Sequence, residues 1–188
     1  MRLQINKSNK LKREFFKRNA DIVAKDLLGK VLVFRNLKGE LLKSKIVETE
    51  AYFSEGDPAS RASKGRNKIS EMMFEDAGRI LIYNVHKYLM FNIVTSEKND
   101  AQAVLIRALE PLNFEGRCNG PGLLTQSMGI NKEIFHGKNV INNENVWLEV
   151  FFEKQDFEII ESFRIGVAKD LDIPLRFYIK YNEFVSRK

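Results

Sequence analysis

Two glutamates and a tyrosine alternate along one short segment, Val47-Glu48-Thr49-Glu50-Ala51-Tyr52. If this segment is a strand, Glu48, Glu50 and Tyr52 point to the same face, because successive side chains alternate. Two carboxylates and a ring on one face suit a general base beside a stacking platform. The residues alone leave a second interpretation open, an exposed strand face with two solvated glutamates, since an unpaired buried charge is costly.

Other kinds of catalytic site find little support in the sequence. The two histidines, His86 and His136, form no Cys/His cluster with metal-ligand spacing, so we predict neither a metal nor another cofactor. The single cysteine, Cys118, has no base nearby in the sequence and is expected to be a buried or incidental thiol. The segment Gly120-Pro121-Gly122 lacks the lysine of a phosphate-binding loop, although it can present helix N-terminal amides to a phosphate.

The composition is typical of a single folded domain with an anionic partner. The chain has 188 residues, 44% of them hydrophobic, which fits one domain with its own core. Its 31 basic and 25 acidic residues give a net charge of +6, which favours nucleic acid over an anionic membrane surface. No stretch approaches the roughly 20 apolar residues that span a bilayer, and the start of the chain lacks the apolar run of a signal peptide. We therefore expect a soluble monomer with no membrane partner.

The elements around the paired glutamates predict an α+β fold. A short helix is expected through Ile22 to Leu28, with Asn19 and Asp21 as N-cap candidates and Gly29 at its end. A long polar stretch at 54–67 is of the kind that often carries function. Further short helices are expected at 72–74 and 123–128, and strands at 30–35, 41–52, 80–85, 88–95, 103–109, 146–152, 157–167 and 174–178.

The first 18 residues form a basic N-terminal arm ahead of a single domain predicted at 19–188. Only Glu14 opposes its basic groups, and Phe15 and Phe16 lie among them. One interpretation is an amphipathic lead-in that packs the two phenylalanines, and the other is an arm that neutralises phosphates. The basic residues of the arm are Arg2, Lys7, Lys10, Lys12, Arg13, Lys17 and Arg18.

An ordered series of motifs resembles the alkyladenine (3-methyladenine) DNA glycosylase family, in particular its mammalian alkyladenine type. The motifs occur in the family's order from about residue 20 to residue 180, so the resemblance covers nearly the whole chain. A single six-residue match would be weak, whereas the ordered series is specific. The series comprises residues 45–52 (KIVETEAY), 57–60 (DPAS), 64–68 (KGRNK), 73–74 (MF), 91–95 (FNIVT), 103–111 (AVLIRALEP), 120–126 (GPGLLTQ), 164–167 (RIGV) and 174–178 (PLRFY).

The resemblance implies a monofunctional enzyme of base excision repair. Such an enzyme hydrolyses the N-glycosidic bond of alkylated or deaminated purines in damaged double-stranded DNA and leaves an intact abasic site, without metal or cofactor. The target nucleotide must be flipped out, because its glycosidic bond is unreachable inside the stack. The implied fold is one compact α+β domain, a curved and mostly antiparallel sheet flanked by short helices. The implied location is the cytoplasm, with nucleoid association in a bacterium.

The resemblance also implies roles for individual residues. Glu50 matches the catalytic glutamate that deprotonates the attacking water, and Tyr52 matches the ring that stacks on the extruded base. Asn92 matches a pocket residue that clashes with the amino group of normal guanine. The residues expected to contact DNA are Val85, Lys87, Tyr88 and Arg107.

Three pocket positions depart from the family pattern. Arg61 stands where a histidine commonly hydrogen-bonds the flipped base. A guanidinium donates but cannot accept, and it would repel a cationic base, which leaves neutral hypoxanthine open as a substrate. Counting along the chain places Ile82 at the second stacking position and Val85 at the tyrosine that wedges into the vacated stack. If the register slips by one residue, Tyr83 or His86 takes these places.

Two other classes of function stay open. The changed pocket at Arg61, Ile82 and Val85 fits a protein that binds damaged duplex without cutting, although such a protein has no need of Glu50. An enzyme that acts on free nucleosides through a carboxylate would need neither the basic arm nor Arg107. Binding that weakens steeply with salt distinguishes the DNA-directed functions from the last one.

Overall fold

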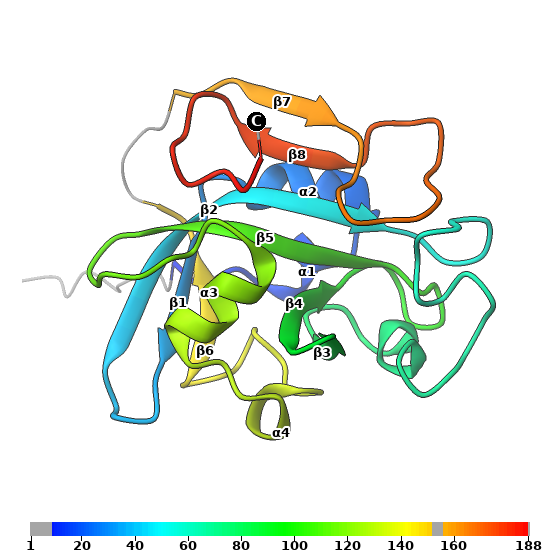
Figure 1. Ribbon diagram of the computed structural model, residues 1–188. Coiled ribbons are helices and arrows are strands. Elements are labelled where there is room, and N and C mark those ends of the chain that lie inside the picture. Colours follow the sequence, from blue (N-terminus) through cyan, green and yellow to red (C-terminus); the bar gives the residue numbers. More distant parts are fainter. Residues whose placement is uncertain (1–8, 152–155, 188) are drawn as a thin grey trace, which may run out of the picture.

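The segment with the paired glutamates forms β2 (Leu41–Tyr52), the longest strand in an eight-stranded sheet (Figure 1). A computed structural model describes residues 9–151 and 156–187. One side of β2 pairs with β5 (Ala103–Pro111). The other side pairs first with β1 (Val31–Arg35) and then with β8 (Arg176–Ile179). This change of partner accompanies the curling of the antiparallel sheet into a half-barrel.

Short elements complete the fold around β2. The strand order is β3-β4-β5-β2-β1-β6, and β7 joins the sheet through β8. The tight hairpin of β3 and β4 therefore extends the sheet beyond β5. The remaining elements are α1 (Arg13–Phe16), α2 (Ala20–Leu27), the 3-10 helix η1 (Glu71–Phe74), β3 (Ile80–Val85), β4 (Tyr88–Val94), α3 (Pro121–Met128), α4 (Lys132–Phe135), β6 (Val146–Glu149) and β7 (Ile159–Ser162).

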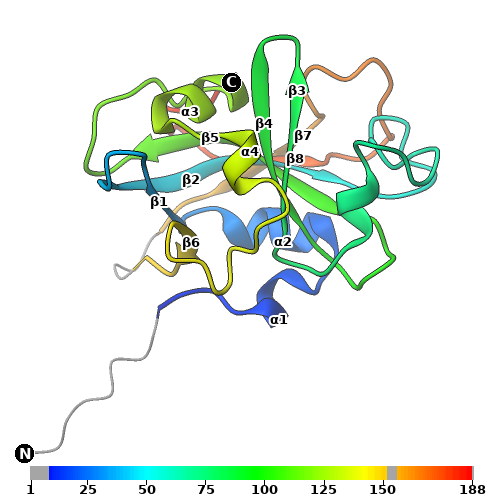
Figure 2. The same cartoon turned by 90° about the horizontal axis from the view of Figure 1, so that it is seen from below.

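The two faces of β2 have different neighbours. Thr49 lies on the face toward α2, where its hydroxyl donates a hydrogen bond of 2.9 Å to the carbonyl of Ala24. Because side chains alternate along a strand, Glu48, Glu50 and Tyr52 lie on the opposite face. Helix α2 packs against β2 and β5, whereas α3 packs against β4 and β5 (Figure 2). The predicted alternation therefore holds, with the apolar face on α2 and the polar face away from it.

Residues 10–18 belong to the folded domain. Phe16 is fully buried, and the Phe15 ring lies edge-on to it with 5.1 Å between centroids. The Arg13 guanidinium donates to the Ala77 carbonyl at 3.1 Å. The packing interpretation of the two phenylalanines therefore describes this part of the chain. Two basic residues of the predicted arm, Arg2 and Lys7, lie outside the described residues.

Most predicted elements lie within two residues of the observed ones, and the predicted α+β class is confirmed. The main correction concerns 157–167, where only Ile159–Ser162 is a strand. At Arg164 the backbone N–H donates to the Asp170 carboxylate at 3.1 Å and not to a neighbouring strand. The strand predicted at 146–152 ends at Glu149, and Phe152 lies outside the described residues.

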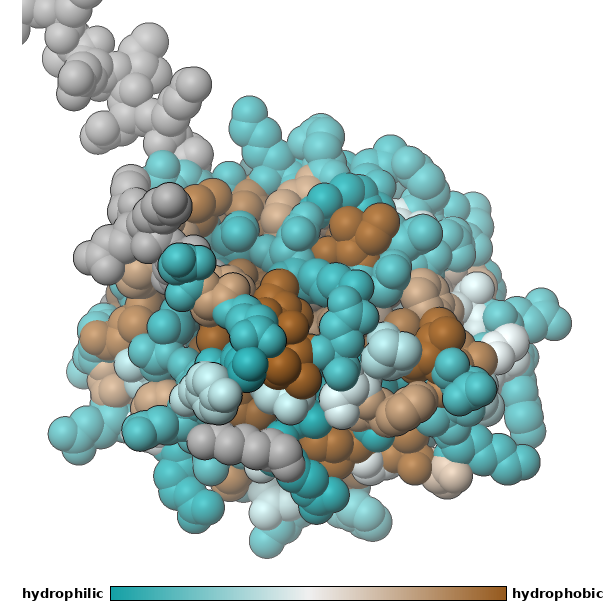
Figure 3. Space-filling view, turned by 90° about the horizontal axis from the view of Figure 1, so that it is seen from above, coloured by the Kyte–Doolittle hydropathy of each residue, from teal (hydrophilic) through white to brown (hydrophobic). Residues whose placement is uncertain are grey.

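The surface seen from above is mainly hydrophilic, with apolar side chains gathered in small patches (Figure 3). Scattered apolar side chains are normal on the surface of a folded domain. Across residues 9–151 and 156–187, no helix has the length and apolarity that a membrane crossing requires.

Candidate active site

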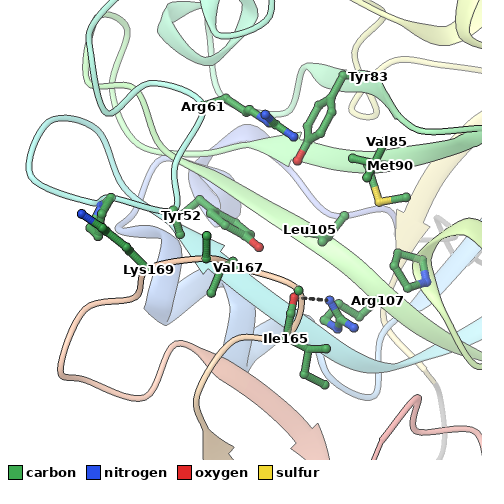
Figure 4. Close-up of a pocket in the computed structure, with 15 residues that line it drawn as sticks. Tyr52, Arg61, Tyr83, Val85, Met90, Leu105, Arg107, Ile165, Val167 and Lys169 are labelled. Atoms are coloured by element: carbon green, nitrogen blue, oxygen red, sulfur yellow. Dashed lines mark hydrogen bonds between the residues drawn. The ribbon is translucent and has the colours of Figure 1, made fainter.

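A cavity of about 540 Å³ opens beside the end of β2 (Figure 4). Its walls come from Tyr52 on β2, the loop segment 58–61, the β3–β4 hairpin with β5, and the loop at 165–169. This volume lies in the range of pockets that hold small organic ligands. The segments that meet here are far apart in the sequence, so the curled sheet assembles the site.

Glu50 lies directly behind the wall of this cavity. Its side chain is fully buried, so the alternative of a solvated glutamate face is wrong. One carboxylate oxygen, Oε1, accepts a 2.7 Å hydrogen bond from the N–H of Ile165 and lies 3.1 Å from Nη1 of Arg107. The other oxygen, Oε2, accepts a 2.7 Å hydrogen bond from the Tyr52 hydroxyl. The three residues that contact the Glu50 carboxylate all line the cavity, namely Tyr52, Arg107 and Ile165. The carboxylate therefore lies just behind the cavity wall.

The environment of Glu50 favours a proton acceptor. Burial raises the pKa of Glu50 above its ordinary value of 4.5, while Arg107, the N–H of Ile165 and the Tyr52 hydroxyl counteract part of this rise. A carboxylate with a raised pKa is a stronger base than a solvated one. Perturbed carboxylates beside a cavity are typical of functional sites.

Arg107 links the two glutamates of β2. The β2–β5 register passes from Glu48↔Ala108 to Thr49↔Ile106, so Arg107 falls at an irregularity of the ladder. Such irregularities redirect side chains, and here Nε of Arg107 contacts Oε1 of Glu48 at 3.1 Å while Nη1 contacts Glu50. Burial opposes the charge of Arg107, but the two carboxylates together raise its pKa. The residue predicted to contact DNA is therefore buried against both carboxylates, at the cavity wall.

Glu48 is buried at the centre of a hydrogen-bonded cluster. Besides Arg107, its carboxylate accepts from Nε of Arg176 at 2.7 Å. It also accepts from the backbone N–H and the hydroxyl of Ser186, at 2.7 and 2.9 Å. These donors offset the cost of burying the charge. Glu48 thus holds Arg107 in place, and Ser186 of the C-terminal segment contacts both side chains.

Tyr52 is held between Glu50 and a buried arginine that carries no role in the sequence prediction. The guanidinium carbon of Arg164 lies 4.6 Å from the centroid of the Tyr52 ring. Arg164 also bonds both carboxylate oxygens of Asp57 at 2.7 Å and reaches Asp170 at 2.6 Å. Burial and the Glu50 carboxylate raise the pKa of Tyr52, so its hydroxyl stays protonated and donates. Arg164 therefore ties the loop before Arg61 to the loop that carries Ile165.

The structure corrects the register along β3. Ile82 is buried in the core, with its N–H donating to Nδ1 of His136 at 3.0 Å, and it does not line the cavity. Tyr83 and Val85 line the cavity instead. They share a face because side chains alternate along a strand, and Ile82 must then face the other way. Of these three residues, Tyr83 and Val85 therefore border the cavity and Ile82 does not.

The tip of the β3–β4 hairpin borders the cavity. Val85 pairs with Tyr88 across the turn, and His86 adopts a left-handed backbone conformation with φ of 53°. His86 and Lys87 are exposed, and Nζ of Lys87 lies 5.5 Å from the centroid of the Tyr88 ring. The Tyr88 ring packs on Gly122 of α3, where a Cβ atom would come within 2.5 Å of the ring. Helix α3 thus supports the hairpin through Tyr88.

Asn92 and Arg61 lie near the two tyrosines. Asn92 on β4 is buried, and its amide donates to the carbonyls of Leu81 and Met90 at 3.2 and 3.1 Å. The guanidinium carbon of Arg61 lies 5.0 Å from the centroid of the Tyr83 ring. A small pocket of about 10 Å³ lies against Tyr52, Arg61, Tyr83 and Asn92. The structure therefore brings the predicted base-binding residues together, with the exception of Ile82.

The described part of the chain contains no group of three or more His, Cys, Asp or Glu side chains that could hold a metal ion. Cys118 is a free, buried cysteine. The polar groups available at the cavity are therefore the Glu50 cluster, the two tyrosines, Arg61 and Lys169.

Comparison with known proteins identifies the family. The family model of methylpurine-DNA glycosylase (MPG) matches residues 14–183. Three similar proteins each bear the name "putative 3-methyladenine DNA glycosylase". The protein of Legionella pneumophila (strain Lens) is 42% identical over 183 residues, covering 95% of this chain and 98% of its own. That of Clostridium perfringens (strain 13 / Type A) is 40% identical over 206 residues, covering 95% and 100%. That of Aeropyrum pernix is 38% identical over 183 residues, covering 94% and 93%. With the family model spanning nearly the whole domain, this chain belongs to the methylpurine-DNA glycosylase family.

Proposed function

We propose that this protein is a monofunctional glycosylase that hydrolyses the N-glycosidic bond of alkylated or deaminated purines flipped out of duplex DNA. Membership of a DNA glycosylase family supports the reaction class. The observation that carries the mechanism is the fully buried Glu50, held by three groups that line a cavity between two tyrosines. A flipped purine fits such a cavity, since a planar base stacks on aromatic rings.

In the proposed reaction, Glu50 accepts a proton from water as the water oxygen bonds to C1′ of the sugar. The bond between C1′ and the base breaks, and the base leaves with the electron pair. The sugar passes through a state that resembles an oxocarbenium ion, which a nearby carboxylate stabilises. Arg107 helps to keep Glu50 ionised through their 3.1 Å contact. Because water is the nucleophile and no lysine forms a covalent intermediate, the product is an intact abasic site.

The second stacking ring is Tyr83 in this proposal. Tyr83 and Tyr52 line the same cavity, and in this proposal the extruded base stacks between the two rings. This arrangement supports the mammalian alkyladenine type of pocket, although the relatives named above are bacterial and archaeal. It also removes one argument for a protein that binds damaged duplex without cutting, namely the absence of a second stacking ring. Val85, Lys87, Tyr88 and Arg107 remain the proposed DNA contacts.

The proposed function is tested with end-labelled duplexes that each carry one lesion, namely hypoxanthine, ethenoadenine or alkylated adenine. Alkali cleaves the strand wherever a base has been released. We expect release from at least one of these duplexes. Tight binding of lesion duplexes without release of any base would instead indicate a protein that binds damaged DNA but does not excise the base.

The rate of excision should fall as the pH drops through the pKa of Glu50, because only the ionised carboxylate accepts a proton from water. Burial raises this pKa above 4.5. The loss of rate should therefore begin at a higher pH than a solvated glutamate would give. Single-turnover rates on a hypoxanthine duplex across the acidic range measure this limb. A limb at the ordinary glutamate value would contradict the buried base.

Two substitutions of Tyr52 should separate its ring from its hydroxyl. The Tyr52→Phe variant keeps the ring but loses the hydrogen bond that lowers the pKa of Glu50. Its acidic limb should move to higher pH, while selection of damaged over normal purines stays. The Tyr52→Ala variant loses the stacking surface, worth roughly 1–3 kcal/mol per base, and should lose selection. Competition between lesion and normal duplexes measures selection, and unchanged selection in Tyr52→Ala would refute stacking on this ring.

A further inference from the structure

We propose that Arg61 reads the O6 and N7 edge of the extruded base, so that the enzyme prefers neutral hypoxanthine to cationic alkylpurines. This inference rests on the proposed glycosylase function, because it names the substrate class of the same cavity. It goes against the preference for 3-methyladenine that the names of the relatives suggest.

Arg61 lies where it can contact an extruded base. It lines both the main cavity and the small pocket that it shares with Tyr52, Tyr83 and Asn92. Its guanidinium carbon lies 5.0 Å from the centroid of the Tyr83 ring. Figure 4 shows Arg61 beside Tyr83, with Tyr52 on the other side of the cavity. A base that enters between the two tyrosines therefore comes close to the guanidinium.

The charge of Arg61 is not neutralised as those of the buried arginines are. Arg107, Arg164 and Arg176 each contact a buried carboxylate at 3.1 Å or less. For Arg61, no carboxylate oxygen within residues 9–151 and 156–187 lies inside the 4.0 Å limit of an ion pair. Lys169 adds a second cation to the lining. Positive charges that come within a few ångströms of each other near a protein surface repel, so a purine methylated at N3 or N7, which is cationic, is disfavoured in this cavity.

The hydrogen-bonding capacity of Arg61 points to a particular base. A guanidinium has five donors and no acceptor, and arginine commonly bonds O6 and N7 of a purine together. Hypoxanthine presents both acceptors, whereas adenine presents an amino donor at position 6. A purine methylated at N7 lacks the N7 acceptor. Arg61 therefore distinguishes hypoxanthine from adenine, the base from which deamination forms it.

Guanine shares O6 and N7 with hypoxanthine, so a second feature must reject it. Guanine differs by an amino group at position 2. Asn92 lines a small pocket together with Arg61, Tyr52 and Tyr83. Two hydrogen bonds fix the Asn92 amide in this pocket. We assign the rejection of guanine to Asn92, which lines this pocket beside Arg61 and for which the family resemblance implies a clash with the guanine amino group.

The test compares excision of hypoxanthine and of cationic 3-methyladenine, neither of which has an amino group at position 2, from otherwise identical duplexes. The Arg61→Gln variant removes the charge but keeps a polar side chain. Its single-turnover rate on hypoxanthine should fall about tenfold or more, as expected for the loss of a two-bond contact. Its rate on 3-methyladenine should stay or rise, so the ratio of the two rates should shift by at least about tenfold. Melting temperatures show that both proteins are folded.

Arg66→Gln is the matched control from the same loop. Arg66 donates to Asn99 and lies 4.4 Å from the centroid of the Phe74 ring, outside the cavity lining. This variant should leave the ratio of the two rates unchanged.

The outcomes separate this inference from the proposed function. If the wild type releases both bases and Arg61→Gln leaves the ratio unchanged, the role of Arg61 is overturned and the glycosylase stands. An equal loss on both lesions overturns it too, because a purely structural residue predicts that result. If the wild type releases neither base, the proposed function itself fails.

Discussion

Replacement of Glu50 by glutamine is expected to slow base excision by roughly 10²- to 10⁴-fold, the usual contribution of a positioned general base. Glutamine has the same shape, and its carbonyl oxygen can still accept from the Tyr52 hydroxyl or the N–H of Ile165, which bond Glu50 at 2.7 Å. It cannot accept a proton from water at neutral pH. The loss should therefore appear in the rate of the chemical step and not in the structure of the site.

Binding and stability distinguish this loss from unfolding. Affinity for a lesion duplex should change little in Glu50→Gln. Because burial raises the pKa of Glu50, the folded state disfavours the ionised form. The neutral variant should then unfold at the same or a higher temperature at neutral pH. The control is Glu158→Gln at an exposed ion pair with Lys180, which should excise at the wild-type rate. Retained excision in Glu50→Gln would exclude Glu50 as the base.

Replacement of Arg164 by methionine is expected to lower the free energy of unfolding by about 3–5 kcal/mol, the usual cost of removing one partner from a buried ion pair. The Arg164 side chain is fully buried, and its loss leaves Asp57 without its cation. It also removes the contact of 4.6 Å with the Tyr52 ring and the link to Asp170. Denaturant unfolding of the variant measures the effect.

Two comparisons make this prediction specific. Arg18→Met breaks the exposed ion pair with Asp26 and should cost less than about 1 kcal/mol. Asp170→Asn leaves the ion pair between Arg164 and Asp57 intact, so it should lower the free energy of unfolding by less than Arg164→Met does. If Arg164→Met does not fold, Asp170→Asn serves as the folded variant in which the network is weakened. A cost for Arg164→Met no larger than for Arg18→Met would show that the buried network contributes little to stability.

Much of the fold follows from local patterns in the sequence. The strand at 41–52 could be predicted, because alternating side chains are a local signal. The end of β7 could not, since Arg164 leaves the ladder to bond Asp57, more than 100 residues earlier. The curl of the sheet depends on the change of partner along β2, which is likewise not a local property.

The site could be predicted in its residues but not in its environment. The spacing of Glu48, Glu50 and Tyr52 indicated a shared face, yet the residues alone favoured a solvated one. Glu50 is buried because Arg107 and the N–H of Ile165 reach it from distant segments. Along β3, counting residues pointed to Ile82, whereas strand alternation places Tyr83 in the cavity. The only local signal for this was that Tyr83 and Val85 are two residues apart.

The role of Arg164 has a weaker signal in the sequence. It lies in a motif shared with the family, six residues before Asp170. A basic residue near an acidic one is usually a solvated surface pair, so spacing alone does not predict burial. Asp57 and the Tyr52 ring contact Arg164 only in the folded chain, because both are more than 100 residues away from it in the sequence.

The central claim, hydrolysis of a glycosidic bond by water, is tested most directly by mass spectrometry of the products from a lesion duplex. The enzyme should release the free damaged base and leave a full-length strand whose mass corresponds to an abasic site, with both products missing in Glu50→Gln. No covalent adduct should form when borohydride is present. A strand broken at the lesion, or a protein trapped on DNA through an amine such as that of Lys169 at the cavity, would contradict the account.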